Sequence, residues 1–164
     1  MDKVYGSPKR QDGLYKIGRD KYELIYGFGE DEQGGWNYRQ RFNYLPTAED
    51  VKRTIEAQIN ADTDSAILTG FVWNGKPVWL SSENQMNFKA AYDIARDTDS
   101  ANLPVKFKLG EDADGKPVYH TFTKLEPLAD FISKVFAYIN KQLNDGWNEK
   151  DGIDYSTFEI KDEC

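Results

Sequence analysis

Aromatic and aliphatic residues recur at every second position over residues 22–28 and, with one glutamine among them, again over 36–44. Period-two alternation with aromatic side chains is typical of antiparallel strands that bury one face. A shorter strand is expected at 13–18, and the acidic, glycine-rich segment 29–35 is expected to form the loop between the long strands. The pattern therefore predicts an antiparallel β-meander within residues 1–46.

A helical spacing follows the meander. Thr47 and Asp50 stand at the capping-box distance that marks the start of a helix. The apolar stripe behind them has an interval of four residues: Val51, Ile55 and Ile59. This helix is predicted to end at about residues 62–64.

Two apolar segments, 66–73 and 76–80, flank an Asn-Gly dipeptide, which is the sequence best suited to a type I′ hairpin turn. With this turn length Trp79 faces Gly70, so the indole can lie over a residue without a side chain. The hairpin is followed by a capping box at Ser82, which predicts a helix over about 83–96.

The same order of elements then recurs. Strands are expected over 105–109 and 116–120, and a turn is expected over 112–115. The next helix, predicted over about 124–144 and ending at Gly146, carries a strong amphipathic stripe. Two β-hairpin–helix units in tandem are therefore predicted, and whether they are a true structural repeat stays open.

These elements predict an α+β protein in which an N-terminal antiparallel β-meander precedes a helix and two β-hairpin–helix units. The expected ranges are an aromatic meander subdomain at 1–46, the helix and the two units at 47–150, and a loose C-terminal tail at 151–164. A chain of 164 residues is long enough to bury a core, and 14% aromatic content supplies large apolar side chains.

The net charge, the apolar stretches and the single cysteine bear on the partner and the location of the protein. The net charge of −7 and the absence of clustered Lys and Arg argue against binding nucleic acid or an anionic membrane. No apolar stretch resembles a signal peptide or is long enough to insert into a membrane. The one cysteine, Cys164, cannot form an intramolecular disulfide, which fits a virion or a reducing compartment such as the host-cell cytoplasm.

The residue counts argue against catalysis. His120 is the one histidine, and its position between Tyr119 and Thr121 is typical of an ordinary strand residue. Cys164, at the terminus, is a poor candidate for a nucleophile. One His and one Cys cannot supply a typical zinc site, and the segment 112–115 fits a turn better than a calcium loop. We therefore expect no catalytic residue, no metal and no cofactor. A pair of catalytic carboxylates among the 28 acidic residues stays open as an alternative.

The aromatic strands of the meander also carry two arginines, and Tyr, Trp and Arg are enriched at interface hot spots. The residues expected to contact a partner are Tyr26, Trp36, Tyr38, Arg39 and Arg41. Since sugars also stack on aromatic rings, a glycan-binding module that serves adsorption to a host is a rival interpretation. A third interpretation is that the aromatic face only packs against the helices of the same domain.

A family resemblance adds a biological setting. The segment Ile67–Ser81, followed by Glu83–Gln85 and Asn87–Lys89, resembles a family of small proteins of phages and prophages of gut anaerobes. A shorter version of this region resembles the C-terminal domain of phage tail-fibre and tail-fibre-assembly proteins. The resemblance covers about 47–150 and implies a helix, a hairpin, a helix, another strand pair and a final helix. It carries no catalytic residue.

The expected function is therefore that of a phage or prophage structural or assembly protein, associated with the tail or tail fibre. It would act by binding other virion proteins, and homo-oligomer formation is left open. The expected location is the virion or the host-cell cytoplasm, without secretion through a signal peptide.

Overall fold

The computed structural model describes residues 1–161. It confirms the α+β class and the predicted order of an antiparallel N-terminal sheet, a helix and two hairpin–helix units. The strands are β1 (Asp2–Tyr5), β2 (Gly13–Gly18), β3 (Lys21–Asp31), β4 (Gly34–Phe42), β5 (Phe71–Trp73), β6 (Lys76–Val78), β7 (Val105–Glu111), β8 (Pro117–Phe122) and β9 (Ile160–Lys161). The helices are α1 (Ala48–Thr69), α2 (Ser82–Asp97), α3 (Leu125–Asp151) and a short 3-10 helix, η1 (Tyr155–Phe158).

The chain divides into two compact units. One joins Met1–Asn60 to the segment that starts at Glu149, and the other is Ala61–Asn148. This division differs from the predicted ranges 1–46, 47–150 and 151–164. It differs because the first half of α1 and the end of the chain pack on the N-terminal sheet.

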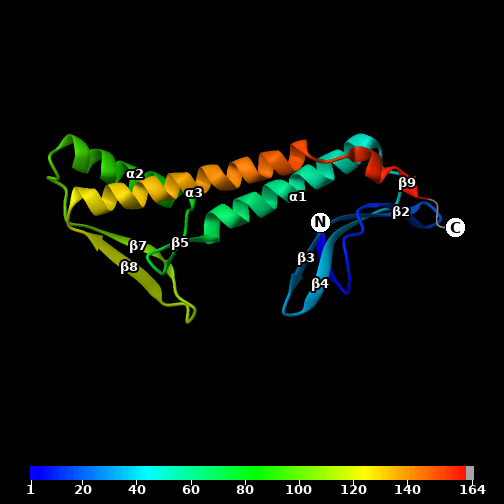
Figure 1. Ribbon diagram of the computed structural model, residues 1–164, viewed down its shortest axis with the longest axis horizontal. Coiled ribbons are helices and arrows are strands. Elements are labelled where there is room, and N and C mark those ends of the chain that lie inside the picture. The colour runs from blue at the N-terminus through cyan, green and yellow to red at the C-terminus, as the bar shows by residue number, and fades with distance from the viewer. Residues whose placement is uncertain (162–164) are drawn as a thin grey trace. The chain divides into compact units, whose positions relative to one another are not determined.

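The first unit is built on a sheet with the strand order β1-β4-β3-β2-β9. Strands β2, β3 and β4 form the predicted meander, in which Tyr26 lies opposite Tyr38. Two edge strands were not predicted: β1 pairs antiparallel with β4, and β9 pairs parallel with β2. Figure 1 shows this sheet with the beginning of α1 and the C-terminal segment beside it.

The start of α1 covers one face of this sheet. Thr47 caps the helix as predicted, because its hydroxyl accepts from the Asp50 backbone N–H at 3.1 Å while the Asp50 carboxylate accepts from the Thr47 N–H at 3.1 Å. The stripe from α1 packs on apolar residues of the sheet and of η1, and fully burying an aliphatic side chain contributes about 1.5–3 kcal/mol. The buried members of this core are Leu14, Tyr22, Leu24, Tyr26, Val51, Ile55, Ile59 and Phe158.

The prediction that this helix ends at 62–64 was wrong, and so was the prediction of a strand over 66–69. Helix α1 continues to Thr69. Its last turn is held within the second unit, where the Tyr138 hydroxyl donates to the Ala66 carbonyl at 2.8 Å and the Gly70 N–H donates to the same carbonyl at 2.9 Å. Packing against α3 therefore overrides the local strand preference.

The second unit contains both hairpins. Asn74 and Gly75 have φ values of 49° and 73°, as the predicted type I′ turn requires. Trp79 does not lie over Gly70, however. The Tyr138 hydroxyl fills that space, and the Trp79 ring lies beside Gly110 of β7, its Cδ1 3.2 Å from where a Cβ would stand. The backbone N–H of Trp79 also donates to the Leu109 carbonyl at 2.7 Å, and this hydrogen bond joins the two hairpins.

The helices of the second unit begin close to the predicted residues. Ser81, one residue before the expected cap, accepts from the Asn84 N–H and starts α2. Helix α3 does not end at Gly146 but continues to Asp151. Glycine stands at this position because α3 and α1 approach each other closely here. A Cβ there would lie 2.5 Å from the Thr63 Oγ1 of α1. Figure 1 shows α2 and α3 on one side of the β7–β8 hairpin, and aromatic rings fill the core between them: Phe71, Trp73, Phe88, Phe107, Phe122 and Phe131.

The described part of the predicted tail is ordered. Phe158 is buried at 6% exposure, and Ile160 pairs with Leu14 of β2. The tail over 151–161 is therefore not loose. The prediction about Cys164 lies outside the described residues.

Candidate docking groove

The structure places the first predicted contact residue, Tyr26, in the core. Its side chain is 3% exposed, and its hydroxyl donates to Glu149 at 2.6 Å. Burial, followed by the hydrogen bond to Glu149, raises the pKa of the Tyr26 phenol. Tyr26 therefore supports the fold and offers a partner no surface.

Trp36 and Tyr38 lie half-buried on the same face of β4 and pack against each other, with ring centroids 5.1 Å apart. The Lys3 ammonium lies 4.3 Å from the Trp36 ring centroid and 2.7 Å from the Asp31 carboxylate. Lys3 therefore already contacts both the Trp36 ring and the Asp31 carboxylate. Because the ammonium lies over the ring, Trp36 and Tyr38 do not form an open surface on which a sugar or a peptide could stack.

Arg39 and Arg41 lie on the other face of β4, where both bind the buried carboxylate of Glu23. The distances from Glu23 are 3.3 Å to Arg39 Nη1 and 2.9 Å to Arg41 Nε. Arg39 and Arg41 thus lie on the opposite face of β4 from Trp36 and Tyr38, and Tyr26 is buried. The five predicted residues therefore do not form one contact surface.

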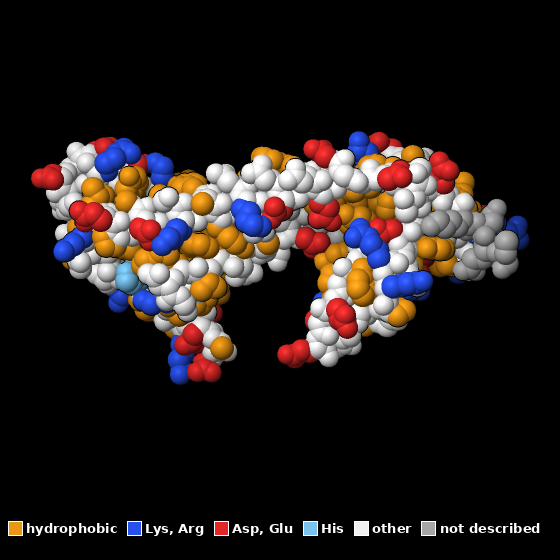
Figure 2. Space-filling model, in the orientation of Figure 1, with side chains coloured by type: hydrophobic (Ala, Val, Ile, Leu, Met, Phe, Trp, Pro, Cys, Tyr) orange, Lys and Arg blue, Asp and Glu red, His pale blue; other side chains and the backbone are white. Residues whose placement is uncertain are grey.

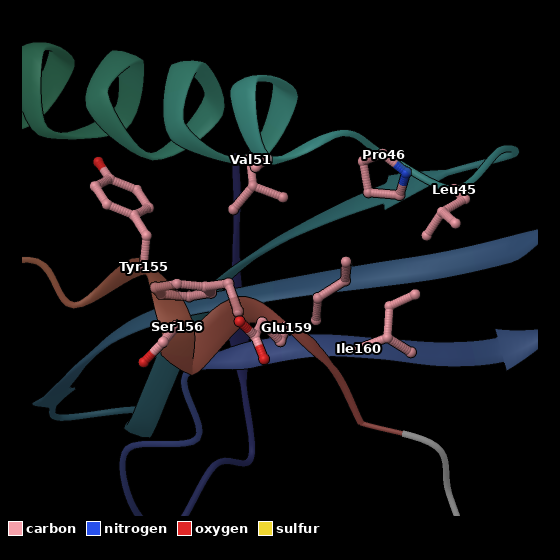
Figure 3. A pocket seen from close by; sticks show the side chains of 10 residues that line it. Leu45, Pro46, Val51, Tyr155, Ser156, Glu159 and Ile160 are labelled. Atoms are coloured by element: carbon pink, nitrogen blue, oxygen red, sulfur yellow. The ribbon is translucent and has the colours of Figure 1, made fainter.

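An apolar groove of about 520 Å³ lies elsewhere in the same unit. One wall comes from Leu45 and Pro46, which lead into α1, and from Val51 on its first turns; Figure 3 shows Val51 pointing down toward the sheet. The facing wall is the segment Tyr155–Ile160. Leu14 of β2 and Phe158 form part of the lining.

The groove exposes apolar side chains at its rim. Leu45 is 51% exposed and Ile160 is 41% exposed, although each borders residues of the buried core. Exposed contiguous apolar surface often marks a site of interaction. Sequence reasoning missed both residues, since Leu45 stood at the end of the predicted meander and Ile160 in the predicted tail.

Three carboxylates lie on or near the groove. Burial, then the charges of Glu56 and Glu49 on α1, raise the pKa of the Tyr155 phenol, so both carboxylates lie near that ring. Glu159 lines the groove directly. The Tyr155 hydroxyl is buried and has no hydrogen-bond partner among the residues described.

The sole histidine lies in the second unit. His120 Nδ1 is 3.2 Å from Lys76 Nζ, and because an ammonium donates only, Nδ1 accepts and the ring proton sits on Nε2. Burial and then the Lys76 charge lower the pKa of His120. Over residues 1–161 no group of three His, Cys, Asp or Glu could hold a metal ion, and no helix is both long and apolar enough to span a membrane.

Comparison of the chain with protein-family models, with curated proteins and with solved structures finds no match.

Proposed function

We propose that this protein acts by docking another protein in the groove between the start of α1 and the segment Tyr155–Ile160. The observation that carries the proposal is the exposure of Leu45 and Ile160 on a preformed apolar groove. The groove is built on a helix and a sheet edge, so a partner would meet a surface that needs little ordering on binding.

The occupant we propose is an apolar segment of the partner that carries Lys or Arg beside its apolar residues. Its apolar side chains would cover Leu45, Val51 and Ile160. Its basic side chains would face Glu49 and Glu159, in a chain whose net charge is −7.

The setting we propose is a phage or prophage virion, with the partner in the tail or tail fibre or in their assembly. This part rests on the family resemblance alone. On the face shown in Figure 2, acidic and basic side chains are interspersed, and the net charge of −7 favours a protein over a nucleic acid as the partner.

The experiment is quantitative mass spectrometry of particles purified from cells that express tagged protein. Wild-type protein is expected at a fixed copy number per particle, or in a fixed ratio to one tail protein in assembly intermediates. Ile160→Glu and Leu45→Glu place a charge on the exposed rim and are expected to lower this occupancy at least about tenfold.

The matched control is Met86→Glu, the same kind of change at an α2 residue that is 71% exposed and outside the groove. It should leave occupancy unchanged. Normal incorporation of Ile160→Glu would rule out the groove as the docking site, and the absence of wild-type protein from both particles and intermediates would rule out the virion setting.

A further inference from the structure

Strand β8, in the unit Ala61–Asn148, is hydrogen-bonded to a neighbouring strand on one side only. It pairs with β7, and the two make a sheet of two strands. Apart from the bonds to β7, no hydrogen bond within residues 1–161 involves the backbone of Pro117–Phe122. In an antiparallel pair, every second residue points its N–H and C=O away from the neighbouring strand. The outer edge of β8 therefore carries a row of unpaired backbone groups.

This edge lacks the protection that other outer strands of the protein have. Proteins usually block a free sheet edge with charged side chains, with very short strands or with a covering segment. Strand β1 carries Asp2 and Lys3, β9 carries Lys161, and β5 has only three residues. Strand β8 has six residues, and none of them is Lys, Arg, Asp or Glu. Pro117 removes a donor only at the first of these residues.

The side chains of β8 suit a strand that pairs on both sides. Val, Tyr, Thr and Phe, which occupy four of its six positions, are enriched in strands. Pro117, Tyr119 and Thr121 share one face of the strand and are all exposed, Tyr119 at 49%. A second strand laid along this edge would cover part of that exposed face.

A second copy of β8 fits this edge. Antiparallel pairing of a strand with itself is symmetric, so each contact occurs twice around a two-fold axis. In the register centred on Tyr119, this ring lies opposite the same ring of the second copy, and Pro117 lies opposite Thr121. Aromatic residues directly opposite each other stabilise antiparallel strands, and no like charges meet along the six residues.

The charges beyond the two ends of β8 are complementary in this arrangement. Antiparallel pairing brings the turn that precedes β8 in one copy toward the residues that follow β8 in the other. This turn carries Asp112, Asp114 and Lys116, so its net charge is negative. Lys124, which follows β8, is exposed. A lysine therefore lies near an acidic turn at both ends of the pair.

The other edge of the hairpin, along β7, is not open in the same way. The Leu109 carbonyl accepts from the backbone N–H of Trp79 at 2.7 Å. The Pro77 carbonyl lies 3.0 Å from where a Cβ of Gly110 would stand, so β6 lies against this part of β7. Two copies that pair through β8 therefore use the open edge of each hairpin, and the assembly closes at two.

We propose that two copies of this protein pair through the free edge of β8, so that two β7–β8 hairpins form one antiparallel sheet of four strands. The pairing requires neither the docking groove nor its partner. A contact of two six-residue strands is smaller than a stable dimer interface, so the expected dissociation constant lies between about 10 μM and about 1 mM.

Sedimentation equilibrium of the full chain, from about 10 μM to about 2 mM, tests the pairing. The mass should rise from that of one chain toward that of two and no further. In nitrogen-15 correlation spectra of the same samples, the amide signals of Val118–Phe122 should shift with concentration. Those of β1, an outer strand that carries charges, should stay fixed.

Tyr119→Glu should weaken the pairing at least about tenfold, because two carboxylates would meet at the two-fold axis. Within one copy the new carboxylate lies opposite Lys108 of β7, so the hairpin gains a favourable pair. Thr121→Glu, opposite Lys106 of β7, is the second variant if Tyr119→Glu does not fold. It should also weaken the pairing, because it places a charge beside Pro117 of the second copy.

The matched control is Val72→Glu, the same kind of change at a β5 residue that is 59% exposed. It should leave the pairing unchanged, and so should Ile160→Glu in the docking groove. The proposal is overturned if the chain stays monomeric up to about 2 mM, or if it forms species larger than two copies. Pairing that survives in both Tyr119→Glu and Thr121→Glu, or that is lost equally in Val72→Glu, would place the interface elsewhere.

Discussion

The hydroxyl of Tyr26 donates a 2.6 Å hydrogen bond to Glu149, a residue 123 positions later in the chain. This bond ties β3 to the end of α3 within the first unit. Burial, followed by Glu149, raises the pKa of Tyr26 in the folded state above its ordinary value of 10.0. The folded state therefore keeps the phenol proton to higher pH than the unfolded state does.

The first prediction concerns this proton. The stabilisation is complete below about pH 10, where both states are protonated, and it is lost as the pH rises above that value. The difference in free energy of unfolding between wild type and Tyr26→Phe should therefore be constant up to about pH 9 and shrink toward pH 11. Urea titrations at each pH measure it.

The effect of Tyr26→Phe on the free energy of unfolding should vary less with pH in the Glu149→Gln background. Without the Glu149 carboxylate, only burial raises the pKa of Tyr26. A difference that is equally large at every alkaline pH would contradict the assignment.

The second prediction concerns the contact of Trp36 with Gly29 across the β3–β4 pair. A Cβ at Gly29 would lie 2.2 Å from Cζ2 of the indole, so Gly29→Ala must displace the ring. The expected loss of stability is about 1–3 kcal/mol, as for other overpacked sites. Tryptophan fluorescence should shift to longer wavelength as the Trp36 ring becomes more exposed.

Gly18→Ala is the control for this change, because the nearest atom to its added Cβ is 3.8 Å away. Its stability should stay within about 0.5 kcal/mol of wild type. Equal stability of both alanine variants would show that Trp36 moves aside without cost.

The third prediction concerns the two arginines that bind Glu23. The Arg39 side chain is 28% exposed and that of Arg41 is 77% exposed. Solvent screens an exposed ion pair strongly. Arg39→Met should therefore cost about 1–3 kcal/mol, while Arg41→Met should cost about 1 kcal/mol or less. Chemical denaturation measures both.

The Glu23→Gln background gives the control, since it removes the buried charge. Arg39→Met should cost less there than in wild type. An unchanged cost would assign the effect to packing of the arginine side chain and not to its charge.

Local signals were enough to predict most of the elements. The capping box at Thr47, the type I′ turn at Asn74 and the alternation in β3 and β4 act over a few residues, so their outcomes follow from the sequence. The end of α1 does not, because Tyr138 on a distant helix decides it. Gly146 resembles a helix terminator in sequence, and only the position of Thr63 shows why it stands inside α3.

The groove could not be predicted either, because the residues that form it come from distant parts of the sequence. Leu45 and Ile160 are 115 residues apart in sequence and become neighbours only because β9 pairs with β2. Composition marked Trp36 and Arg39 because their residue types are common at interfaces. It could not show that Lys3 and Glu23 would already occupy them.

The last prediction separates the support of the groove from its use. Phe158 is buried against Tyr26 and Tyr155, with both centroid distances at 6.3 Å, and it anchors the segment that forms one wall. Phe158→Ala should cost about 3–5 kcal/mol and reduce docking through loss of that wall.

Ile160→Glu, two residues further on, should cost much less than Phe158→Ala, because the Ile160 side chain is 41% exposed and Phe158 is buried. Docking should nevertheless be lost, since a carboxylate would replace apolar surface and face the partner's apolar segment. Stability by urea titration and occupancy in particles measure the two effects separately. If docking fell only in proportion to stability across both variants, the groove would be a structural feature of the unit and the partner surface would lie elsewhere.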